Sequence, residues 1–338
     1  MRITAVLCLL CAVACSSPAP REPSARPSPA PSARPSPPPA VQAEAARLVA
    51  AGSSGAVVHV RKGDRTWQAA AGRADAGVPM RTDHRFRIAS ITKTFTATLV
   101  LQQVEEGRLA LTDRVDQVLP GVIKTKATVA DLLRHTSGIS DYLRDERFTK
   151  DLGGGAHLRH WPPRELLKYA DKEAQGYSNT NFILLGMILE KVSRKPYREL
   201  LSERITGPQG LTATELPADD LPKDLAHGIH TDGVDNAELD SSIFWTAGGL
   251  ISTAADVSSF YHWVFTQDLG RRLQAGGFGI FAQTLGCGRR VYSHSGWIFG
   301  YSGMAMSSAD GETEVVVQLA SGQPSDAIAA AERLMCTA

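Results

Sequence analysis

The sequence predicts an α+β fold (an α/β sandwich), in which an antiparallel sheet built from both termini is flanked by helices and interrupted by an inserted all-helical lobe. Strand-like segments occur near both ends of the folded part, whereas helical patterns fill its middle. With 43% hydrophobic residues, the 338-residue chain can bury a large core. We expect one domain at 41–338, with a sheet lobe at about 41–88 and 240–338 and a helical lobe at about 89–239.

The first 40 residues are expected to lie outside this domain. In the signal region, 1–15, Arg2 precedes an apolar stretch too short to span a bilayer comfortably, and small residues lead up to Cys15. This resembles a bacterial lipoprotein signal, which implies a lipidated Cys15 and a membrane anchor. An ordinary cleaved secretory signal is the alternative, and both predict export. Ten of the 19 prolines lie in 16–40, so we expect an extended spacer there.

The first elements of the domain are a short helix and a hairpin. Residues 40–50 have a helical pattern. Segments 55–60 and 66–72 are strand-like, and Gly63 and Asp64 supply the turn between them.

Helices follow in the middle of the chain. From 90 to 107, apolar residues such as Phe95 and Leu99 recur near one helical face, and Gly107 provides a C-terminal stop. Capping residues or prolines predict further helices at 128–138, 162–170, 179–193 and 196–205.

The last part of the chain returns to strands. We expect them at 277–286, 289–294, 301–308 and 313–320, with a turn before the last one. A helix at 325–335 closes the chain, with Ser325 or Asp326 as its cap.

The charge balance excludes one class of partner. The chain carries 36 basic and 35 acidic side chains and a formal net charge of +1, so it lacks the basic footprint of a nucleic-acid-binding protein. We expect no nucleic-acid partner and a monomeric protein.

The stretch "FRIASITKTF" carries the first chemical signal. It places Ser90 at a helix start and Lys93 one turn later on the same face. A serine hydroxyl needs a base within reach to act as a nucleophile, and a lysine can be that base when burial destabilises its ammonium. Alone, Ser-x-x-Lys is weak, because a capping serine with a solvated lysine has the same pattern.

A second signal is "YSN", which precedes the predicted helix at 179–193. Tyr177 near Lys93 would have its phenolate favoured by the ammonium and could also accept the serine proton. Asn179 offers a donor and an acceptor to a substrate amide. A packing tyrosine and a helix-capping asparagine are the alternatives.

The third signal is "HSG" followed by Trp297, at the end of a predicted strand. His294, Ser295 and Gly296 on an edge strand would let a substrate backbone pair alongside. The N–H groups of Trp297 and Ser90 could form an oxyanion hole. A structural histidine at a strand end is the alternative for His294.

Together, S-I-T-K, Y-S-N and H-S-G stand in the order of the motifs of serine β-lactamases and penicillin-binding proteins. The sequence resembles the branch of class C β-lactamases, D-alanyl-D-alanine carboxypeptidases and related esterases. The stretches "LLRHTSGI", at 132–139, and "TAGGLISTAADVSSF", at 246–260, are also similar to this family. The resemblance runs from about residue 55 to the C-terminal helix.

The resemblance implies roles for these residues. Ser90 would be the acylated nucleophile, and Lys93 and Tyr177 would share general-base duty. Asn179 would orient the substrate amide. His294 would give positive or hydrogen-bonding character. A further group, Ser295, would touch the substrate's terminal carboxylate or ester, and the stretches around 135 and 248 would support the site.

One residue departs from the family pattern. Members that bind a substrate carboxylate often have a second hydroxyl residue just after the glycine, and here Trp297 stands there. This favours a more apolar acyl substrate. No residue of the sequence is identified as a cationic partner for a carboxylate.

The folded part contains two cysteines, Cys287 and Cys336. Export would permit a disulfide between a late strand and the last helix, and two separate thiols are the alternative. The chemistry expected here needs no metal or organic cofactor.

We therefore expect an exported serine hydrolase that forms an acyl-enzyme with D-Ala-D-Ala-type peptides or β-lactams. The partner would be a small-molecule or peptide substrate. An esterase on the same fold, and a lipoprotein that binds cell-wall fragments or β-lactams without turnover, are the alternatives.

Overall fold

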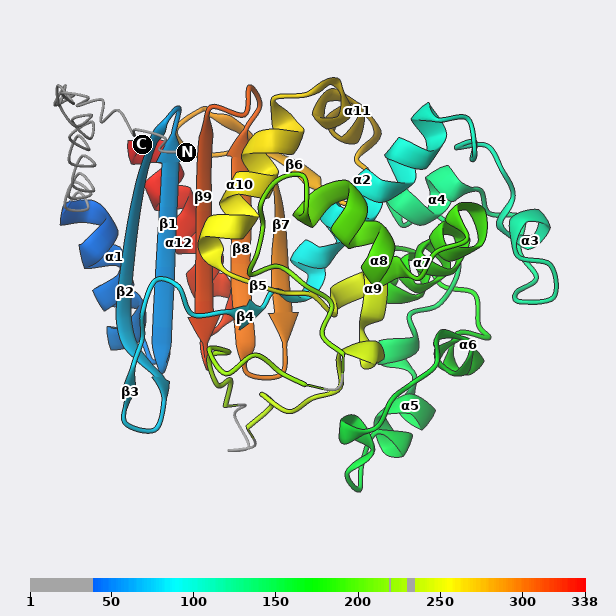
Figure 1. Ribbon diagram of the computed structural model, residues 1–338, viewed down its shortest axis with the longest axis horizontal. Helices are drawn as coiled ribbons and strands as arrows, with labels where there is room; N and C mark the ends of the chain where they lie inside the picture. Colours follow the sequence, from blue (N-terminus) through cyan, green and yellow to red (C-terminus); the bar gives the residue numbers. More distant parts are fainter. Residues whose placement is uncertain (1–38, 219, 230–234) are drawn as a thin grey trace, which may run out of the picture. The chain divides into compact units, whose positions relative to one another are not determined.

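The computed structural model describes residues 39–218, 220–229 and 235–338 (Figure 1). The predicted signal region, Cys15 and nearly all of the proline-rich spacer lie outside these residues. Within the described residues, no helix is both long and apolar enough to cross a membrane.

A seven-stranded antiparallel sheet forms the centre of the fold, in the order β3-β2-β1-β9-β8-β7-β6. Its central pair joins the two ends of the domain, because β1 aligns with β9 from Gly55–Ala320 to Lys62–Thr313. The predicted α+β class, with a sheet built from both termini, is confirmed. The strands are β1 (Gly55–Lys62), β2 (Arg65–Asp75), β3 (Val78–Pro79), β6 (Phe281–Thr284), β7 (Arg290–Ile298), β8 (Tyr301–Ser308) and β9 (Thr313–Ala320). The short pair β4 (Phe86–Arg87) and β5 (Ile251–Ser252) is separate.

The two faces of the sheet bury different cores, because side chains alternate along each strand. Ala56, Val58 and Val60 of β1 point to the face covered by α1 (Pro39–Ala50) and α12 (Pro324–Thr337). The opposite face packs against α10 (Ala254–Phe265) and the larger core of the helical part. Figure 1 shows α10 and α12 on opposite faces of the sheet.

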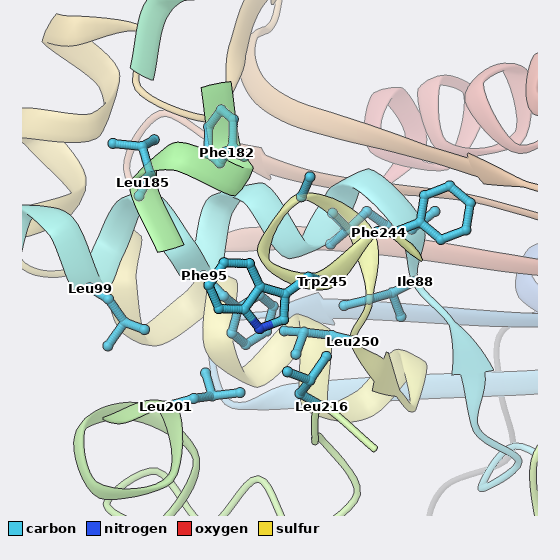
Figure 2. Close-up of a cluster of buried hydrophobic side chains, with 14 of the residues drawn as sticks. Ile88, Phe95, Leu99, Phe182, Leu185, Leu201, Leu216, Phe244, Trp245 and Leu250 are labelled. Atoms are coloured by element: carbon cyan, nitrogen blue, oxygen red, sulfur yellow. The ribbon is translucent and has the colours of Figure 1, made fainter. Parts of the chain in front are cut away.

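The helical part surrounds α2 (Thr92–Glu105), which is buried on nearly all sides. The predicted helix is present, and it is buried on more faces than the one that carries Phe95 and Leu99. Buried threonines on the helix hydrogen-bond to neighbouring segments, as Thr94 does to the Gly279 carbonyl and Thr96 to the Thr246 carbonyl. Phe95 and Leu99 of α2 lie among apolar side chains drawn from several other elements (Figure 2).

The other helices are α3 (Val115–Val118), α4 (Val129–Arg134), α5 (Glu146–Asp151), α6 (Pro163–Leu166), α7 (Asn179–Ser193), α8 (Tyr197–Leu201), α9 (Trp245–Gly248) and α11 (Asp268–Gly276). The capping box expected at the start of α4 is present, formed by Thr128 and Asp131.

A disulfide joins Cys287, in the turn between β6 and β7, to Cys336 in α12. Of the two alternatives left open by the sequence, the structure has the disulfide and not two separate thiols. The bond closes a loop with a sequence separation of 49 residues. The bond therefore links the β6–β7 turn to the last helix.

Removing this disulfide should destabilise the protein. For a loop of this length, the chain-entropy account gives about 4 kcal/mol of stabilisation. The Cys287→Ser/Cys336→Ser double variant should therefore unfold at a lower urea concentration than the oxidised wild type. Reduced wild type should match the double variant. Equal urea midpoints for the oxidised protein and the double variant would refute a stabilising role.

Candidate active site

Ser90 lies in a 3₁₀ turn, η1 (Ala89–Ile91), directly before α2. Ala89 has a φ of 48°, in the left-handed region that residues with a Cβ rarely adopt. Strand β7 passes so close to this turn that a Cβ on Gly296 would lie 2.3 Å from the Ile88 carbonyl oxygen. Glycine at 296, which was expected to bind substrate, thus lets the strand and the serine turn come together.

Lys93 is fully buried beneath Ser90. Its Nζ has three oxygen neighbours: Ser90 Oγ at 2.9 Å, Asn179 Oδ1 at 2.7 Å and Ala247 O at 2.6 Å. Burial lowers the pKa of Lys93 to about 7, against the opposing attraction of Asp141. The amide and carbonyl oxygens can only accept hydrogen bonds. A neutral amine therefore gives them both of its hydrogens and directs its lone pair at Ser90 Oγ.

Tyr177 also contacts the serine, since its hydroxyl donates a hydrogen bond to Ser90 Oγ at 2.9 Å. Burial raises the pKa of Tyr177, and the negative charge of Asp141 raises it further. The expectation that the Lys93 ammonium stabilises a Tyr177 phenolate does not hold, because loss of hydration dominates. Tyr177 is a phenol at neutral pH and faces the serine as a proton donor.

The loop at 135–142 holds the Tyr-Ser-Asn segment in place. The His135 ring stacks on the Tyr177 ring at 4.2 Å between centroids, and His135 Nδ1 accepts a hydrogen bond from the Ser178 N–H. The Ser140 carbonyl accepts hydrogen bonds from the hydroxyls of Ser178 and Thr180. The stretch "LLRHTSGI" thus lies on the element that orients Tyr177.

Asn179, the first residue of α7, uses both ends of its amide within the protein. Its Oδ1 accepts from Lys93, and its Nδ2 donates to Asp141 Oδ2 at 2.9 Å. Asp141 was not singled out from the sequence, although it stands two residues beyond the family-like stretch. Its carboxylate accepts a hydrogen bond from the Leu143 N–H at 3.2 Å as well.

His294 is buried and neutral. Its Nδ1 lies 2.6 Å from the Ser295 carbonyl oxygen, which can only accept, so Nδ1 carries the proton. Burial and the nearby Lys93 lower the pKa of His294 to about 3. Of the two characters expected at this position, positive charge is ruled out and hydrogen bonding is retained. Its Nε2 has no hydrogen-bond partner among the described residues, which leaves an acceptor.

The outer side of β7 is open beside the serine. Strand β8 pairs with β7 from Val291 to Ile298, whereas β6 pairs with it only up to Ser293. Ser295 and Trp297 follow on this unpaired stretch and line the cleft. The edge predicted from the sequence is therefore available for an extended ligand.

The cleft beside Ser90 has a volume of about 640 Å³. All of the predicted site residues line it except Lys93 and Gly296. Much of the remaining wall is apolar: Leu143, Phe148, Leu152, Phe244, Phe281, Ile298 and Phe299. Trp297 and Phe281 are 54% and 50% exposed, although both are large and apolar. Arg144 also lines the cleft and was missed from the sequence, because nothing in its surroundings marks it as a site residue.

No metal centre accompanies these residues in the described part of the chain, where no three histidine, cysteine, aspartate or glutamate side chains are placed to hold an ion. The groups that contact Ser90 Oγ are the Lys93 amine and the Tyr177 phenol, and the Asn179 amide contacts the amine.

Known proteins are similar to this chain in sequence and in fold. The chain is 28% identical over 272 residues to a D-aminopeptidase of Cereibacter sphaeroides, covering 71% of this chain and 51% of that protein. It is 30% identical over 154 residues to penicillin-binding protein 4* of Bacillus subtilis, covering 41% of this chain and 32% of that protein. The matches thus span about a third to a half of the length of these relatives.

Among solved structures, a D-stereospecific amidohydrolase from Streptomyces sp. superposes with a TM-score of 0.78 and 32% identity, covering 86% of this chain and 97% of that chain. D-amino acid amidase from Ochrobactrum anthropi, at 24% identity and a TM-score of 0.77, shares the fold over 88% of this chain and 98% of that one. The model of the Beta-lactamase family matches residues 41–335. The chain belongs to the Beta-lactamase family of serine hydrolases.

Proposed function

We propose that the protein is an exported serine hydrolase in which Ser90 forms an acyl-enzyme with D-residue peptides or amides, of the D-Ala-D-Ala type, or with β-lactams. The observation that carries this proposal is the convergence on Ser90 Oγ. The Lys93 amine and the Tyr177 hydroxyl both lie 2.9 Å from this atom. One can take its proton and the other can give one.

Acylation follows from the protonation states of these groups. Ser90 Oγ attacks the substrate carbonyl carbon while Lys93 takes the hydroxyl proton. The carbonyl oxygen becomes an oxyanion facing the N–H groups of Ser90 and Trp297. Tyr177 gives its proton to the leaving nitrogen as the C–N bond breaks, and regains one from Lys93. Water then attacks the acyl carbon, the bond from this carbon to Ser90 Oγ breaks, and a proton from the water returns to Oγ as the acid leaves.

The cleft lining supports an apolar acyl group. The aromatic and aliphatic side chains beside Ser90 form a wall that a small, charged acyl group would leave unfilled. Similarity to a D-stereospecific amidohydrolase over nearly the whole folded chain favours amides of D-residues. The same apolar wall favours an esterase as the second candidate function.

Export and anchoring are part of the proposal. The disulfide between Cys287 and Cys336 suits an oxidising compartment. The sequence before the domain supports a lipid anchor at Cys15, with the proline-rich segment as a spacer between the membrane and the domain.

Wild type and Ser90→Ala should be compared on nitrocefin, a D-Ala-D-Ala peptide, D-phenylalanine p-nitroanilide and p-nitrophenyl butyrate. We expect turnover of an amide or peptide, and a loss of about 10⁴-fold or more in Ser90→Ala. Intact mass should detect an acyl group on the wild type alone. Rapid cleavage of the ester only would favour the esterase. Stoichiometric acylation without turnover would indicate a binding protein.

Activity should depend on pH through Lys93. The amine accepts a proton only when it is neutral, so kcat/KM should fall about tenfold per pH unit below an apparent pKa of about 7. The low pKa values of His135 and His294 place their titration well below this limb. A pH–rate profile of the wild type measures the apparent pKa of this acid limb. An acid limb near pH 4 would instead indicate a carboxylate base.

Trp297→Ser should change acyl-group preference. The exposed indole provides apolar area at the cleft, so its removal should lower kcat/KM for p-nitrophenyl butyrate about tenfold relative to the acetate ester. Leu158→Ser is the matched control, because Leu158 is 51% exposed and does not line the cleft. An unchanged ratio of the two esters in Trp297→Ser would rule out a role for the indole in acyl binding.

A further inference from the structure

We propose that Asp141 is a positioning residue for the reaction: through the side-chain amide of Asn179, it keeps the lone pair of Lys93 directed at Ser90. This inference rests on the proposed function, because it concerns the base in the acylation step.

The geometry forms a continuous chain of hydrogen bonds. Asp141 Oδ2 accepts from Asn179 Nδ2 at 2.9 Å, Asn179 Oδ1 accepts from Lys93 Nζ at 2.7 Å, and Lys93 Nζ lies 2.9 Å from Ser90 Oγ. A carboxylate can only accept, so it fixes which end of the amide faces it. The other end, Oδ1, must then face the amine.

The opposite orientation of the amide would damage the base. If Nδ2 faced Lys93, the amide would offer a donor to a neutral amine and compete with Ser90 for its lone pair. Lys93 would also lose one of the two acceptors that hold its hydrogens away from the serine. Asn179 has no intrinsic preference between these orientations, so the preference must come from its second partner.

Asp141 is itself held rigidly. It caps the 3₁₀ turn Tyr142–Arg144 by accepting from the Leu143 N–H, and its side chain is only 5% exposed. The neighbouring Ser140 carbonyl is tied to Thr180 of α7 at 2.7 Å. Arg144 Nε lies 3.9 Å from the Asp141 carboxylate, but the arginine side chain is 78% exposed. The carboxylate thus directs its strongest hydrogen bond to Asn179.

The charge of Asp141 acts on the same amine. Among the described residues, the charge of Asp141 is what opposes the effect of burial on Lys93. Within the part of the protein that the structure describes, the charged side chains near these hydrogen bonds are Asp141 and, at the cleft, Arg144. His135 and His294, which also face Lys93, are neutral. Loss of the carboxylate should therefore make Lys93 easier to deprotonate while disturbing its orientation.

Three variants separate this role from a structural one. In Asp141→Asn, Oδ1 can still accept from Leu143, but Nδ2 then faces Asn179 Nδ2, which forces one amide to turn. In the exchange variant Asp141→Asn/Asn179→Asp, every hydrogen bond can form again with the carboxylate placed directly on Lys93. The control is Asp145→Asn: Asp145 also caps a helix through its side chain and is buried, but it pairs with Arg147.

The measurement is the pre-steady-state burst of p-nitrophenol from p-nitrophenyl acetate as a function of pH, since this activated ester reports on the serine and its base. Asp141→Asn should acylate about 10²-fold more slowly at its optimum. Its acid limb should move to lower pH by roughly half a unit or more. The exchange variant should move the limb above that of the wild type, and Asp145→Asn should leave it unchanged. Thermal melts of all variants monitor folding.

The outcomes are distinct. If wild type gives no burst and Ser90 gains no acetyl group, the proposed function fails. If wild type reacts but Asp141→Asn and Asp145→Asn share one acid limb, with rates that follow their melting temperatures, Asp141 is only structural and the inference is overturned. Opposite shifts of the limb in Asp141→Asn and the exchange variant support it.

Discussion

The burial of Lys93 is the constraint on which the site depends. Its hydrogen-bond neighbours are a hydroxyl, a side-chain amide oxygen and a backbone carbonyl oxygen, all uncharged. An ammonium in this position would lose its hydration without a directly bonded carboxylate to replace it, so the neutral amine becomes accessible near neutral pH. Burial thus lets the Lys93 amine accept a proton near neutral pH. It also leaves Tyr177 protonated, because the same burial disfavours a phenolate.

The architecture serves to bury that amine while leaving the serine accessible. Helix α2 is buried along most of its length, and Lys93, on its first turn, is fully buried. The serine escapes burial because it lies in the 3₁₀ turn before the helix, at the edge of the sheet. Strand β7 reaches this turn only because residue 296 is glycine. The sheet in turn depends on β1 and β9, which bring the two ends of the domain together.

The overall class and the principal motif residues could be predicted from the sequence because they leave local signals. Strand-like segments bounded by turn residues marked the strands, and Ser90, Lys93 and Tyr177 stand in short ordered motifs. The helix at 90–107 was predicted, but the burial of its other faces was not, since buried threonines there form hydrogen bonds that hydropathy does not reveal. Asp141 and Arg144 were missed because their importance comes from loop contacts. The charge state expected for Tyr177 was wrong, and the choice between a positive and a neutral His294 stayed open, because burial depends on the whole fold.

The ionisation of Lys93 is the most direct test of its role as the base. Lysine labelled with ¹³C at Cε, assigned with Lys93→Met, allows its titration to be followed by NMR in the resting enzyme. A buried amine that serves as the base should titrate with a pKa of about 7. A value near the ordinary lysine value of about 10.4 would contradict it, because Lys93 would then be an ammonium at neutral pH and could not take the serine proton.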